Sequence, residues 1–95
     1  MKEGYAHEFS MQIAREDGIG PDFEIAGGLR RDDGGWHASL VQRPAPHVIY
    51  NSQTVEVTAP TGSLALEGVG SAARQLGFNP RAEVVLRRLM EQANL

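Results

Sequence analysis

The segment RRDDGGWH, residues 30–37, gathers two arginines, two aspartates and a histidine around a Gly-Gly pair. Acid/base catalysis by two carboxylates requires that they occupy different environments on opposite sides of a substrate. Asp32 and Asp33 are instead neighbours in the chain. Asp-Gly between two alternating runs is a strong hairpin signal, because both residue types tolerate turn geometry. We therefore expect this segment to form a turn and not a catalytic site.

The other residues suited to chemistry match no known motif. His7, His37 and His47 have spacings unlike those of metal ligands. Ser39 lies near His37 in an alternating stretch and not in a strand-to-helix elbow, and no acid is specified as a third partner. EGVGSAA, residues 67–73, contains G-x-G but lacks the third glycine, the lysine and the βαβ context of a nucleotide site. The sequence therefore predicts no enzyme, metal or cofactor.

Length and composition favour a single α+β domain over residues 1–95, mainly strands to residue 60 and mainly helices beyond it. The chain has 95 residues, enough for one modest core and too few for two. It contains no cysteine, which excludes disulfides, thiolate nucleophiles and cysteine-based zinc sites. No apolar run approaches the roughly 18 residues that span a bilayer, and MKEGYAHEFS lacks the apolar stretch of a secretory signal. We expect a cytoplasmic protein without a membrane partner.

Alternation of apolar and polar residues predicts strands in the first two-thirds of the chain. YAHEFSMQI (5–13), FEIAGGLR (23–30) and WHASLVQ (36–42) each show this period of two. Gly27 falls on the inward side of the second run, which suggests a bulge or a close approach by another backbone. HVIY (47–50) and TVEVTA (54–59) add one or two strands after the PAP break. We expect four or five strands, largely antiparallel.

The apolar spacing becomes helical beyond Pro60. One helix is expected from Leu64 to Leu76, with Gly77 as its C-terminal cap. Alternatively, SLALE (63–67) forms a last strand and the helix starts only near Ser71. A second helix is expected from about residue 80 to residue 93, capped by Asn79. Strands followed by helices predict an α+β fold in which an antiparallel sheet of four to five strands packs against two C-terminal helices. The expected core contains Phe9, Ile13, Phe23, Ile25, Trp36, Leu40, Leu86 and Leu89.

Charge is unevenly distributed along the chain. The net charge is −3, with −4 on residues 1–33 and +1 on residues 63–95, and eight of the nine basic residues are arginine. Guanidinium binds carboxylate or phosphate through two parallel hydrogen bonds, which suits interfaces. Arg81 and Arg88 should face the same way, because seven residues are almost two helical turns. The candidate partner-binding residues are the arginines of the helical part: Arg74, Arg81, Arg87 and Arg88.

DDGGWHASL, residues 32–40, resembles the hairpin of HicB-type antitoxin domains, in which an acidic-glycine turn precedes an aromatic strand and a helix follows. QRPAPHV stands where that family has a segment of the proline-glycine-cysteine type. The resemblance implies an antitoxin-like regulator.

With no assembled catalytic set, we expect a small non-catalytic interaction domain that binds and modulates or inhibits a partner macromolecule, most simply a protein. The short chain, its acidic first part and its arginine-bearing last helix would suit a compact inhibitor encoded by a phage or mobile element, such as an anti-CRISPR-type protein. The alternative is a nucleic-acid-binding regulator that uses the arginines of the last helix, but a net acidic chain lacks the broad positive surface that supplies affinity for phosphate backbones. A third hypothesis is a small enzyme whose site the sequence does not reveal. Each of these three hypotheses is compatible with a homo-oligomer.

Overall fold

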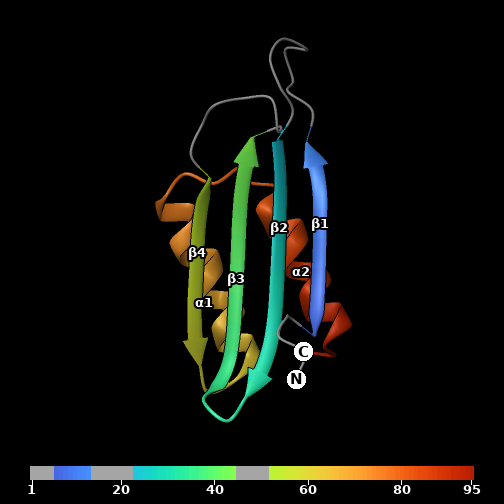
Figure 1. Ribbon diagram of the computed structural model, residues 1–95, viewed down its shortest axis with the longest axis vertical. Coiled ribbons are helices and arrows are strands. Elements are labelled where there is room, and N and C mark those ends of the chain that lie inside the picture. The colour runs from blue at the N-terminus through green and yellow to red at the C-terminus, as the bar shows by residue number, and fades with distance from the viewer. Residues whose placement is uncertain (1–5, 14–22, 45–51) are drawn as a thin grey trace.

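The computed structural model describes residues 6–13, 23–44 and 52–95. Its elements follow the order β1 (His7–Ile13), β2 (Phe23–Asp32), β3 (Gly35–Pro44), β4 (Gln53–Ala59), α1 (Gly62–Gln75) and α2 (Ala82–Gln92). The strands form one antiparallel sheet in the order β1-β2-β3-β4. Both helices cover the same face of this sheet, α1 over β3 and β4, and α2 over β1 and β2 (Figure 1). The predicted α+β fold is confirmed.

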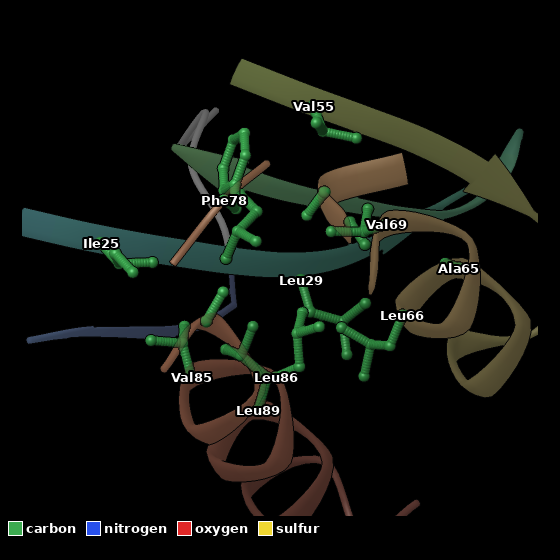
Figure 2. Close-up of a cluster of buried hydrophobic side chains, with 14 of the residues drawn as sticks. Ile25, Leu29, Val55, Ala65, Leu66, Val69, Phe78, Val85, Leu86 and Leu89 are labelled. Atoms are coloured by element: carbon green, nitrogen blue, oxygen red, sulfur yellow. The ribbon is translucent and has the colours of Figure 1, made fainter. Parts of the chain in front are cut away.

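The hydrophobic core fills the layer between the sheet and the helices. Figure 2 shows side chains of β2, such as Ile25 and Leu29, meeting Val85 and Leu89 of α2 in this layer. All four of these side chains are completely buried. Of the eight residues expected in the core, the aliphatic ones are buried, and the three aromatic ones are partly buried and pack against it: Phe9, Phe23 and Trp36.

Gly27 occupies a position where the sheet and α2 approach closely. A Cβ atom on Gly27 would lie 2.7 Å from Val85 Cγ1 and 2.9 Å from Leu89 Cδ1. The strand itself continues without a bulge, because residues on both sides of Gly27 keep their register with β1 and β3. The expected bulge is therefore wrong, and the close neighbours are side chains of a helix, not another backbone.

The segment RRDDGGWH forms the expected hairpin between β2 and β3. Asp33 and Gly34 make the turn, and Asp32 pairs with Gly35. Gly35 has φ +112°, a conformation that favours glycine because it has no Cβ atom. The Asp32 carboxylate accepts a hydrogen bond from the Gly34 amide at 2.8 Å, which stabilises the turn.

Helix α1 includes residues 63–67, so the alternative of a last strand at SLALE is wrong. Thr61 caps its start by accepting a hydrogen bond from the Leu64 amide at 3.1 Å. Gly77, with φ +81°, follows its end as predicted. The amides of Gly77 and Phe78 donate to the carbonyls of Arg74 and Ala73, respectively, which closes the helix with a Schellman motif.

Helix α2 begins at Ala82, two residues later than expected, because residues 80 and 81 form a turn before it. Asn79 nevertheless caps this turn, since its Oδ1 accepts from the Arg81 amide at 2.9 Å. The helix ends at Gln92. HVIY, residues 47–50, lies outside the described residues, so the strand expected there stays a prediction. Within the described part of the chain, neither helix has the length and apolarity required to cross a membrane.

Candidate functional site

His37 is the centre of a polar network at the hairpin end of the sheet. Its Nε2 lies 2.8 Å from Asp32 Oδ1, and its Nδ1 lies 2.9 Å from Thr58 Oγ1. The register explains this contact, because His37 pairs with Thr58 across β3 and β4. Thr58 was not identified from the sequence, since only the pairing of β4 brings it to the histidine. Ser39, the hydroxyl considered there, is the next residue on the same face of β3.

Asp32 receives three hydrogen bonds in this network. In addition to the His37 contact, Arg30 Nη1 donates to Oδ2 at 2.7 Å and the Gly34 amide donates to Oδ1. The hydrogen bond with His37, followed by that with Gly34, lowers the pKa of Asp32 from 3.8 to about 2. The carboxylate therefore stays charged at neutral pH and joins the turn to β3.

An acid, an imidazole and a hydroxyl linked by hydrogen bonds in that order are also the arrangement used in nucleophilic catalysis. Here the Asp32 side chain is 45% exposed, whereas catalytic electrostatics depend on a water-excluded site. The Gly34 amide donates a hydrogen bond to the same carboxylate and so ties it to the turn. The geometry thus supports a structural role, in which the network ties the β2–β3 turn to β4.

The four arginines expected to bind a partner do not form one patch. Arg74 and Arg87 line the same groove between the two helices. Arg88 lies on the other side of α2, where its guanidinium is 6.0 Å from the Phe9 ring centroid and pairs with Glu91 at 3.3 Å. Arg81 lies in the turn one residue before α2, so the expectation that it faces the same way as Arg88 stays a prediction. Arg88 therefore lies apart from the groove that Arg74 and Arg87 line.

Most described arginines are already neutralised by an acid. Arg74 Nη1 lies 3.3 Å from Glu83 Oε1, and Arg30, Arg43 and Arg88 have carboxylate partners of their own. Arg31 lies over the Trp36 ring. Of the arginines in the helical part of the described chain, only Arg81 and Arg87 have no described acidic partner at ion-pair distance. The positive charges of that part without a described acidic partner are thus those of Arg81, in the turn before α2, and Arg87, at the groove between the helices.

A largely apolar depression lies between the two helices, next to Arg74 and Arg87. It consists of two adjoining cavities of about 220 and 370 Å³ that share Gly70, Arg74, Glu83 and Leu86. Gly70 permits the close helix contact, since a Cβ there would lie 3.1 Å from Leu86 Cδ1. We call this depression the α1–α2 groove. Its other lining residues include Leu66, Glu67, Ala73, Phe78, Arg87 and Met90.

The G-x-G considered as an anion loop lies within α1, so its backbone amides belong to the helix interior and not to a helix start. Among the described residues, no three His, Cys, Asp or Glu side chains gather in a way that could hold a metal ion.

No protein-family model matches the chain, and no curated protein or solved structure is significantly similar to it. The resemblance of residues 32–40 to the HicB hairpin therefore stays a prediction.

Proposed function

We propose that this chain is a small interaction domain that binds a protein partner through the α1–α2 groove and thereby modulates or inhibits that partner. The observation that carries the proposal is an apolar groove whose rim holds an arginine with no acidic partner among the described residues. Leu66, Leu86 and Met90 supply apolar lining, and Arg87 lies beside them. The cytoplasmic setting expected from the sequence belongs to the same proposal.

The charges at the groove favour a particular occupant. Arg74 is neutralised by Glu83, whereas Arg87 has no acidic partner at ion-pair distance among the described residues, although Glu67 also lines the groove. An apolar side chain of a partner would fill the groove, and a carboxylate next to it would pair with Arg87. Arginine is enriched at the residues that dominate binding energy, especially next to a buried apolar anchor. The proposed partner segment therefore carries an apolar residue beside an Asp or Glu.

A nucleic-acid partner is disfavoured by the same charges. Affinity for phosphate backbones requires several free cations on one face. Of Arg81 and Arg87, only Arg87 lines the groove, and Glu67 and Glu83 line it as well. A phosphate backbone laid along the groove would therefore meet two carboxylates as well as the Arg74 and Arg87 guanidinium groups, so the groove has no net positive charge.

The test compares Arg87→Gln with Arg81→Gln. Both residues are exposed arginines without an acidic partner among the described residues, and both changes remove one positive charge, but only Arg87 lines the groove. The partner is isolated from the native host with the wild-type protein, and its affinity for each variant is measured after nuclease treatment. We expect Arg87→Gln to weaken binding by about tenfold or more, which is the range of a hot-spot arginine, and Arg81→Gln to leave it unchanged.

Equal affinities of the two variants would contradict a role for the groove. Loss of binding after nuclease treatment, together with a steep dependence on salt, would favour the nucleic-acid alternative instead. Circular dichroism of both variants verifies that each is folded.

A further inference from the structure

The face of the sheet opposite the helices contains a row of four residues in register. Glu8 pairs with Gly28, Gly28 with Ser39, and Ser39 with Glu56, so the row crosses all four strands. These residues alternate with the core residues of their strands and therefore point away from the helices, toward the viewer in Figure 1. Two glutamates thus lie at the edges of the sheet, with two small residues between them.

The centre of this row consists of two small residues with little exposed surface. Ser39 is only 9% exposed and Gly28 is buried, although neither faces the helices. A neighbouring cavity of about 300 Å³ is lined by Glu8, Phe9, Ser10, Ala26, Gly27 and Arg43, and the Arg43 guanidinium pairs with Glu24. We call Gly28 and Ser39 the Gly28–Ser39 seat.

The two glutamates carry charge that is not neutralised within the described ranges. On this face Arg30 pairs with Asp32, and Arg43 pairs with Glu24. Among the described residues, no cationic side chain lies at ion-pair distance from the carboxylates of Glu8 or Glu56. Three strand spacings separate their Cα atoms, a distance of about 14 Å. The seat is therefore flanked by two available negative charges.

We infer that this face docks an extended basic segment of a partner protein, across the strands. Residues i and i+4 of an extended chain lie about 13 Å apart and point to the same side, as does residue i+2. Lys or Arg at i and i+4 would then reach Glu8 and Glu56, and a small apolar residue at i+2 would lie on the seat. This surface is on the opposite layer from the α1–α2 groove, and the inference does not depend on the proposed function.

Two other occupants fit the face less well. A second copy of the chain would bring the glutamates of both copies together without compensating cations. Single-stranded nucleic acid would require aromatic platforms and positive charge. The Phe and Trp residues of the described strands all pack toward the core: Phe9, Phe23 and Trp36.

The test is an NMR titration of the ¹⁵N-labelled full chain with the blocked peptide Ac-KTVTK-NH2. The acidic peptide Ac-ETVTE-NH2 serves as the ligand control. We expect the basic peptide to shift the amide resonances of Gly28 and Ser39, and the acidic peptide to leave them in place. The variant with both Glu8→Gln and Glu56→Gln should bind the basic peptide about tenfold more weakly, as expected for the loss of two ion contacts.

The matched variant combines Asp33→Asn with Glu91→Gln, which changes the net charge equally at residues outside the row. It should retain the wild-type affinity. Thr54→Lys provides a second test that leaves both glutamates in place, because Thr54 lies on the same face as Glu56, two residues away on β4. Its added cation should also weaken the binding of the basic peptide.

Three results would overturn the inference: equal weakening in the matched variant, peptide-induced shifts confined to α1 and α2, or equal binding of the acidic peptide. Shifts of Gly28 and Ser39 that depend on protein concentration without peptide would identify a second copy as the occupant and would also contradict it.

Discussion

A methyl group on Gly27 of β2 would lie 2.7 Å from Val85 Cγ1 of α2. No ordinary Cβ atom tolerates such a separation, so α2 depends on a glycine at this position to reach the sheet. Val85 and Leu89, the two side chains above Gly27, are completely buried as a result. The absence of one side chain in the sheet therefore determines how closely the second helix packs.

We expect Gly27→Ala to lower the free energy of unfolding by about 1–3 kcal/mol, the usual range for added volume in a packed core. Both Val85 and Leu89 would have to move to admit the methyl group. Gly34→Ala is the control, because Gly34 lies in the exposed turn and its nearest contact would be the Asp32 carboxylate at 3.3 Å. Urea denaturation of the two variants measures the difference. Equal stability would show that α2 does not pack on β2 as described.

Leu89→Ala should cost about 2–5 kcal/mol, because it removes a completely buried side chain and leaves a cavity. Leu64→Ala removes the same atoms from a side chain of α1 that is 51% exposed, and we expect a change within about 0.5 kcal/mol. Thermal and chemical unfolding provide the comparison. A similar loss in both variants would be inconsistent with the assignment of the apolar stripe of α2 to the core.

The stability contributed by Asp32 should depend on pH. Its pKa is lowered to about 2 in the folded protein from 3.8, so its contribution is complete above about pH 4 and disappears as the pH falls toward 2. The difference in stability between wild type and Asp32→Asn should therefore narrow over that window. Unfolding curves at several pH values measure it.

A difference that stays constant from pH 4 to pH 2 would contradict the hydrogen-bonded network. His37→Gln is the companion variant, because the hydrogen bond with His37 is the largest cause of the lowered pKa of Asp32. When Asp32→Asn is introduced into the His37→Gln protein, its effect on stability should depend less on pH than it does in the wild type.

Thr61→Ala should destabilise the protein by about 1 kcal/mol, the typical cost of removing an N-cap side chain. The hydroxyl of Thr61 accepts from the Leu64 amide, which otherwise has no helical acceptor. Thr61→Ser retains this oxygen and should keep most of the stability. If Ser and Ala behave alike at this position, the cap contributes nothing, whereas a loss confined to Ala confirms it.

Local patterns in the sequence predicted most of the elements described in this fold. Period-two alternation predicts the strands, and the Asp-Gly turn predicts the hairpin, because each depends on residues next to one another. Gly77 predicts the end of α1 for the same reason. The choice between strand and helix for residues 63–67 could not be made locally, because a short apolar run fits both; the Thr61 cap and packing against the sheet favour the helix.

Tertiary structure alone decided which distant residues meet. Sequence spacing could not reveal that Thr58 contacts His37, or that Glu8 and Glu56 share one row, because strand register results from the packing of the entire sheet. The tertiary structure likewise placed Arg74 and Arg87 at one groove and Arg88 next to Phe9, since the rotation of a helix is set by its buried stripe. The role of Gly27 was also decided by the tertiary structure. The side chains of α2 that lie above Gly27 are far from it in the chain, and only the packing of that helix on β2 brings them into contact.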